Sequence, residues 1–181
     1  MKYIHIGLGK TGSTFLQEEI FPKISNLNEL DYFNKALDQN ITNLDNYFLS
    51  NENLVGEFFS SYSWEVSVKK NLEKFGEDAN IILIIREPLE YFASVFCQSY
   101  QAYNIVKEEE FFLDTSMSDA YIKKNNYYFI NYEKFCYSEL IDLYKKNFQN
   151  VYIIKYEDIK NLSIWSKIFS NKDIKKIKIN N

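Results

Sequence analysis

The sequence predicts a three-layer α/β fold, with a largely parallel central sheet flanked by helices, in a single domain over residues 1–181. Three observations support this class. Short apolar runs of strand length alternate along the chain with longer segments of helical spacing. Residues 80–85 (NIILII) contain five consecutive apolar residues, as expected of a parallel strand buried on both faces. No internal repeat or linker is visible, and 181 residues suit one domain.

The first predicted elements are a strand over residues 3–8 and a helix that follows the next turn. The strand is a short apolar run with two isoleucines. Ser13 and Thr14 are good N-cap residues, and they are followed by apolar residues at helical spacing. A polar, asparagine-rich stretch over 25–53 has patches of helical spacing and indicates no chemistry. We expect a second strand over 53–59 (NLVGEFF) and a helix over 62–75.

The second half continues the alternation of strands and helices. Strand 80–85 is followed by a helix over 88–103, with proline in its first turn. Helical patterns over 107–124 and 131–148 precede a last strand over 151–155 (VYIIK). Because ligands of parallel α/β sheets bind outside the carboxyl ends of the strands, the residues just after each strand are the expected site.

A glycine-rich turn follows the first strand. Gly7, Gly9 and Gly12 allow sharp turning and close approach to a ligand, and a strand, turn and helix N-terminus together form an anion site. A Walker A loop has its lysine directly after the second glycine, but Ser13 holds that place and the lysine of this turn is Lys10. The turn predicts a phosphate or sulfate site unlike that of ordinary ATPases; a turn without a ligand is the alternative.

The single arginine of the chain is the second candidate anion ligand. Arg86 directly follows strand 80–85, and its planar fork can hold a phosphate through two hydrogen bonds, which lysine cannot do. Ser94 lies eight residues later, where its hydroxyl could supplement the grip. The alternative is a structural arginine that pairs with Glu87 or Glu90.

These two segments resemble motifs of sulfotransferases that use 3′-phosphoadenosine 5′-phosphosulfate (PAPS). KTGSTFLQ resembles their 5′-phosphosulfate loop, and REPLEYFASVFCQSY resembles their 3′-phosphate motif. The resemblance implies a P-loop NTPase-like sulfotransferase fold. It also implies that Lys10 reaches the phosphosulfate, that the loop holds the 5′-phosphate, and that Arg86 and Ser94 bind the 3′-phosphate. The implied nucleotide-binding residues are Lys10, Thr11, Gly12, Ser13, Thr14, Arg86 and Ser94.

The resemblance extends to residue 159, because residues 156–159 (YEDI) match a segment that many bacterial sulfotransferases carry. In that family these residues cap a strand, so we interpret them as support for the fold. The family normally has more chain after this segment than residues 160–181, and we interpret the sequence as a truncated or minimal member. Lys172, Lys175, Lys176 and Lys178 either contribute to phosphate binding or form a solvated tail.

The expected reaction is in-line sulfuryl transfer from PAPS to a hydroxyl of a glycan or small metabolite. Lys10 could neutralise the leaving phosphate without a metal, and no metal site is predicted from two distant cysteines and one histidine. By resemblance to glycan sulfotransferases, Glu57 is the candidate base, with a surface or capping contact as the alternative. His5 is the rival base, but it lies inside the first strand, where we expect a hydrogen-bonded core residue.

Two other functions stay open at this point. A nucleotide kinase or other NTPase with a degenerate loop predicts a magnesium-binding aspartate after an apolar strand, and a non-catalytic relative that binds PAPS or 3′,5′-ADP predicts binding without turnover. The net charge of −4 argues against broad nucleic-acid binding, and no apolar run reaches bilayer length. The chain enters a strand almost at once, which leaves no room for a signal peptide and indicates a cytoplasmic protein.

Overall fold

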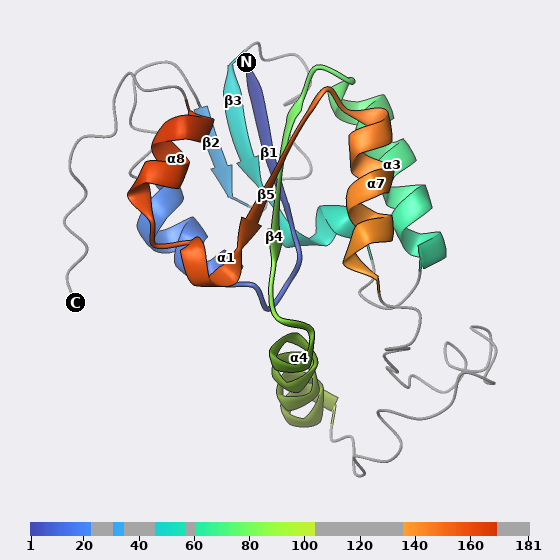
Figure 1. Cartoon of the computed structure of the whole chain (residues 1–181), viewed down its shortest axis with the longest axis vertical. Coiled ribbons are helices and arrows are strands. Elements are labelled where there is room, and N and C mark those ends of the chain that lie inside the picture. Colours follow the sequence, from blue (N-terminus) through green and yellow to red (C-terminus); the bar gives the residue numbers. More distant parts are fainter. Residues whose placement is uncertain (23–30, 35–45, 57–60, 104–135, 170–181) are drawn as a thin grey trace.

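The computed structural model describes residues 1–22, 31–34, 46–56, 61–103 and 136–169. Its strands form one parallel sheet with the order β2-β3-β1-β4-β5 (Figure 1). These strands are β1 (Lys2–Gly7), β2 (Asp31–Asn34), β3 (Tyr47–Ser50), β4 (Asn80–Ile85) and β5 (Asn150–Lys155). The helical segments are α1 (Ser13–Phe15), the π-helix η1 (Leu16–Ile20), the 3₁₀ helix η3 (Glu52–Val55), α3 (Ser61–Phe75), α4 (Pro88–Tyr103), α7 (Tyr137–Asn147), the 3₁₀ helix η4 (Tyr156–Asp158) and α8 (Leu162–Ile168).

Helices cover both faces of the sheet, which confirms the predicted three-layer α/β class. Helices α3 and α7 lie on one face, and α1, η1 and α8 lie on the other (Figure 1). Strand β4 supplies Ile81 and Leu83 to the first core and Ile82 and Ile84 to the second. All four side chains are fully buried, which is the physical reason that this strand is apolar without alternation.

Most predicted elements agree with the structure. The strand over 80–85 is β4, and the expected strands over 3–8 and 151–155 correspond to β1 and β5 with ends shifted by one residue. The helix expected over 62–75 is α3, and α4 begins at Pro88 as predicted. The helix expected over 131–148 corresponds to α7, which begins at Tyr137 after the extended Cys136, while residues 131–135 lie outside the described residues. The helical pattern over 107–124 lies outside the described residues.

The strand predicted over 53–59 is wrong in its described part. Residues 52–55 form the turn η3, because the Asn51 side chain accepts a hydrogen bond from the Asn53 N–H at 3.0 Å and Gly56 ends the turn with a φ of 93°. The strand beside β1 is instead β3, and β2 lies beyond it; both fall in the polar stretch for which no strand was predicted. These two strands were not predicted because each has only four residues and lies in an asparagine-rich segment.

The order of the strands defines where a ligand can bind. Strand β1 lies between β3 and β4, so the chain crosses to one side of β1 for β2 and β3 and to the other side for β4 and β5. A crevice forms at such a switch point, outside the carboxyl ends of the strands. Helix α4 projects from this same edge (Figure 1). None of the described helices combines the length and the apolar character that crossing a bilayer requires.

Candidate functional site

The loop that follows β1 is built on two left-handed backbone positions. Lys10 has a φ of 63° and Gly12 a φ of 81°, so the chain turns twice between the strand and α1. Left-handed positions within a turn direct consecutive N–H groups toward one concavity, which is a favourable arrangement for an anion. The Lys10 side chain is partly exposed and forms no ion pair with any residue that the structure describes. Its ammonium is therefore available at the mouth of the loop.

Two hydroxyls of the loop are directed into the protein. Thr11 Oγ1 and Ser13 Oγ both donate to the carbonyl of Leu8, at 2.5 and 3.1 Å, and both residues are buried. These protons stabilise the turn and are not available to an anion in this arrangement. Any contact of the two residues with a phosphate then comes from their backbone N–H groups. Thr14, by contrast, is exposed at the start of the helix.

The structure brings Arg86 against this loop. Arg86 Nη1 donates to the backbone carbonyl of Lys10 at 3.3 Å, although the two residues are 76 positions apart in the sequence. The contact forms because β1 and β4 are neighbouring parallel strands whose carboxyl ends lie at the same edge. Both anion-binding segments predicted from the sequence thus share one location.

The guanidinium keeps part of its hydrogen-bonding capacity. Arg86 Nε pairs with Glu90 Oε2 at 3.3 Å, and Nη1 uses one proton on Lys10. Among the described residues no other hydrogen bond engages this side chain, so the second Nη1 proton and both Nη2 protons stay free. That edge of the fork is the one that can hold a phosphate through two parallel bonds. The structural ion pair and the anion-binding role are therefore compatible.

The structure adds a residue whose role was not predicted from the sequence. Tyr156, the first residue of η4, lies under Arg86, with 4.4 Å between the guanidinium carbon and the ring centroid. The same ring touches the loop: a Cβ built on Gly12 would lie 3.1 Å from Tyr156 Cε2 and 2.8 Å from Ile159 Cδ1. The YEDI segment therefore packs directly on the site. The motif was visible in the sequence, but its contacts with Arg86 and Gly12 were not.

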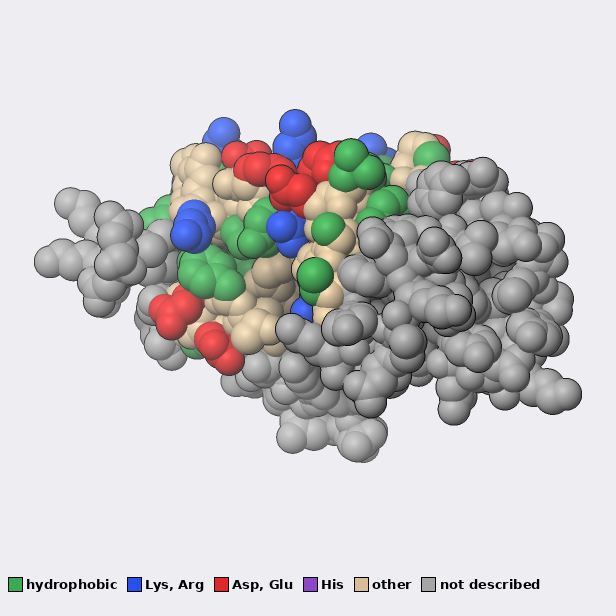
Figure 2. All heavy atoms as spheres, turned by 90° about the horizontal axis from the view of Figure 1, so that it is seen from below, with side chains coloured by type: hydrophobic (Ala, Val, Ile, Leu, Met, Phe, Trp, Pro, Cys, Tyr) green, Lys and Arg blue, Asp and Glu red, His purple; other side chains and the backbone are tan. Residues whose placement is uncertain are grey.

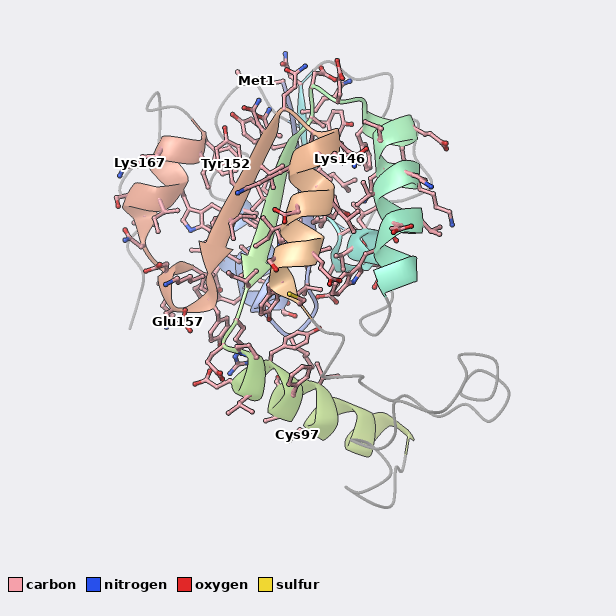
Figure 3. The ribbon with its side chains drawn as sticks, turned by 45° about the vertical axis from the view of Figure 1, so that its right-hand side comes forward. Met1, Cys97, Lys146, Tyr152, Glu157 and Lys167 are labelled. Carbon is pink, nitrogen blue, oxygen red and sulfur yellow. The ribbon has the colours of Figure 1, made fainter. Side chains whose placement is uncertain are left out.

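Further carboxylates lie near the Tyr137 hydroxyl, which contacts the Arg86 backbone. Glu87 and Glu157 act on the Tyr137 hydroxyl, which accepts a hydrogen bond from the Arg86 backbone N–H at 3.3 Å. The pKa of Tyr137 is raised to about 12, mainly by burial. Figure 2 views this edge from below, where basic side chains emerge among acidic ones. Glu157 is labelled in Figure 3 in the turn after β5, above α4. An anion bound to Arg86 competes with Glu90, the ion-pair partner of this arginine.

Two predicted site residues have no contact with this cluster that the structure describes. Ser94 is partly buried on α4, and no hydrogen bond joins it to Arg86 in the described part of the chain. Glu57 lies outside the described residues. The strand beside β1 ends at Ser50 and is followed by η3, so the expected strand does not lead up to Glu57.

His5 belongs to a buried polar group beneath the loop. His5 Nδ1 lies 2.8 Å from Ser50 Oγ, which also accepts a hydrogen bond from Gln17 Nε2 at 3.1 Å. All three residues are buried, and burial lowers the pKa of His5 to about 3. A neutral imidazole with no exposed surface does not act as a general base on a bound acceptor. The group instead joins β1, β3 and η1 below the loop.

Comparisons with known proteins bear on the fold. No protein-family profile matches the sequence, and no curated protein matches it. The structure is similar to the crystal structure of a sulfotransferase from Alicyclobacillus acidocaldarius, with a TM-score of 0.65 over 99% of this chain and 85% of that protein. The sequences are 10% identical in this comparison. The chain has a sulfotransferase-like fold.

The parallel pairing of β1 and β4 brings the carboxyl ends of the two strands side by side at this edge. A metal centre is not apparent there: no group of three histidine, cysteine or acidic side chains in the described residues could hold a metal ion. Lys10 and Arg86 are two cationic groups at this edge, and Glu90 is the ion-pair partner of Arg86.

The lowered pKa of His5 predicts a pH dependence of stability. Below pH 6.5 the unfolded chain binds a proton that the folded protein excludes, so this contribution to stability is complete above pH 6.5 and is lost as the pH falls toward 3. The His5→Asn variant should have a shallower decrease of the unfolding free energy between pH 6.5 and 4, by up to about 1.4 kcal/mol per pH unit. Urea denaturation at several pH values measures this slope. Identical slopes would contradict the assignment, because His5 is the single histidine of the chain.

The close packing on Gly12 predicts that Gly12→Ala destabilises the protein. The left-handed backbone alone costs about 1–2 kcal/mol for a residue with a Cβ, and the methyl group would overlap Ile159 and Tyr156. Thermal unfolding should show a lower melting temperature. In an Ile159→Val background, which removes Cδ1, the penalty for alanine at position 12 should be smaller but not abolished. An unchanged melting temperature in Gly12→Ala would refute the described loop conformation.

Proposed function

We propose that this protein is a PAPS-dependent sulfotransferase. The observation that carries the proposal is the contact of Arg86 with the Lys10 loop, with Nη1 and the carbonyl oxygen 3.3 Å apart. A lysine and an arginine with free hydrogen-bond donors at the end of neighbouring parallel strands suit a ligand with two anionic ends. PAPS and 3′,5′-ADP are such ligands, and the sulfotransferase-like fold supports the choice.

Each residue has a distinct role in the proposed reaction. PAPS supplies an activated sulfuryl group. Arg86 binds the 3′-phosphate, supplemented by Ser94, and the backbone of residues 11–14 binds the 5′-phosphate. Lys10 neutralises the charge that builds on the leaving phosphate during in-line displacement. Glu57 stays our candidate to take the proton of the acceptor hydroxyl, which belongs to a glycan or a small metabolite.

The strand ends next to β1 favour this proposal over an NTPase. A P-loop NTPase holds magnesium with the Ser/Thr that follows its loop lysine and with an aspartate at a strand end. Here β3 ends at Ser50, which bonds to His5 and Gln17, and β4 is followed by Arg86. Neither position offers a carboxylate. The residue after Gly12 is Ser13, whose hydroxyl proton is directed to Leu8.

Nucleotide binding tests the proposal first. Thermal shift with 3′,5′-ADP should raise the melting temperature by mass action, more than with 5′-AMP and with little effect of magnesium. Arg86→Lys keeps the charge but loses the planar fork, so its affinity for 3′,5′-ADP should fall about 10- to 100-fold. Its affinity for 5′-AMP, which lacks the 3′-phosphate, serves as the matched control. A preference for ATP with magnesium would instead favour the NTPase.

Turnover tests the proposed roles of Lys10 and Glu57. With labelled PAPS and a panel of glycan and small hydroxyl acceptors, Lys10→Met should lower kcat about 100- to 1,000-fold, because charge on the leaving phosphate is no longer neutralised. Glu57→Gln should abolish transfer while nucleotide affinity is spared. Unchanged turnover in Glu57→Gln would remove this residue from the mechanism. Nucleotide binding without transfer to any acceptor would identify a non-catalytic relative.

A further inference from the structure

Tyr156 connects two segments of the site that are distant in sequence. It directly follows β5, the edge strand paired with β4, so its backbone lies beside the end of β4 from which Arg86 emerges. Its ring lies beneath the guanidinium, with 4.4 Å from the Arg86 Cζ to the ring centroid, and against Gly12 of the loop. The ring is partly buried, as is Arg86. One aromatic side chain thus contacts both anion-binding segments.

The contacts of Arg86 suggest what the ring does. An arginine side chain has several rotatable bonds, and fixing them costs conformational entropy when the ligand binds. An aromatic face attracts a guanidinium that stacks on it and leaves the N–H edges of the fork open. The hydrogen bond to the Lys10 carbonyl and the ion pair with Glu90 then set the orientation of the fork within this plane. The guanidinium is thereby held in place before any anion arrives.

The loop depends on the same ring. Because Gly12 has no side chain, Ile159 packs on it more closely than a Cβ would permit, and Tyr156 packs on it at a distance that would be tight for a Cβ. The ring therefore contacts the loop at Gly12 and the arginine at its guanidinium, and the two segments also meet directly at the Lys10 carbonyl. A side chain of another shape at position 156 would change both contacts of the ring.

We propose that Tyr156 is a positioning residue that determines selectivity for a nucleotide with a 3′-phosphate, by holding Arg86 in the orientation that receives this group. The inference rests on the proposed function and deepens it. It differs from a direct contact of Tyr156 with the nucleoside, because a direct contact would strengthen the binding of nucleotides with and without a 3′-phosphate alike.

The test compares affinities for 3′,5′-ADP and 5′-AMP, measured by calorimetry on the full chain. Tyr156→Leu should lower the preference for 3′,5′-ADP by about 3- to 20-fold, the range that a partly desolvated cation–π contact provides. Tyr156→Phe keeps the aromatic face and should retain most of the preference. Tyr152→Leu is the matched control, since Tyr152 is a partly buried tyrosine of β5 that packs against the same apolar core; it should leave the preference unchanged.

A double-mutant comparison separates positioning from general damage. In an Arg86→Ala background, Tyr156→Leu should have no further effect on the ratio of the two affinities. Equal losses for both nucleotides in Tyr156→Leu, or an unchanged ratio, would overturn the inference while leaving the proposed function intact. A wild-type protein that binds 3′,5′-ADP no better than 5′-AMP would overturn the proposed function and this inference with it.

Discussion

A single guanidinium joins three segments that are far apart in the sequence. Arg86 follows β4, donates to the carbonyl of Lys10 in the loop after β1, and lies on the ring of Tyr156 after β5. A partly buried charge of this kind is stable only when polar and aromatic partners replace the water that it has lost. The loop carbonyl, the ring and Glu90 supply these partners. This one side chain therefore contacts all three segments.

The parallel sheet makes this meeting possible. Strands that run in the same direction end at the same edge, so residues that follow β1, β4 and β5 come together regardless of their separation along the chain. The two apolar cores hold the strands in register from both faces. Beneath the loop, the buried hydrogen bonds of Ser50 with His5 and Gln17 attach the first helical segment to the sheet. The core therefore fixes the backbone from which the charged groups extend.

The acidic residues at this edge stabilise Arg86 but also weaken its attraction for a bound anion. Glu90 neutralises Arg86 without using the end of its fork, and Glu87 and Glu157 lie close by. Such neighbours reduce the attraction for any anion and so favour a ligand that engages both Lys10 and Arg86 over a single small ion. A nucleotide with two anionic ends meets this requirement, whereas one phosphate group meets it only in part.

The fold class and two segments of the site could be predicted from the sequence alone. A short uninterrupted apolar run such as β4 is typical of a strand buried on both faces, and a glycine-rich turn with Lys10, like an arginine directly after β4, indicates an anion site at the strand ends. The short strands β2 and β3 were not predicted, because four residues within asparagine-rich segments have too little periodicity. Residues 53–55 were misassigned to a strand because the Asn51 side chain stabilises a turn there.

The side-chain contacts of the site emerge only from the folded chain. Tyr156 packs on Gly12 and beneath Arg86, and the hydroxyls of Thr11 and Ser13 point inward. These contacts depend on side-chain directions across neighbouring strands and on the pairing of β1 with β4 and of β4 with β5. The spacing of residues along the sequence indicates which of them share a face of one helix or strand. It does not indicate which strands pair, or which side chains meet across them.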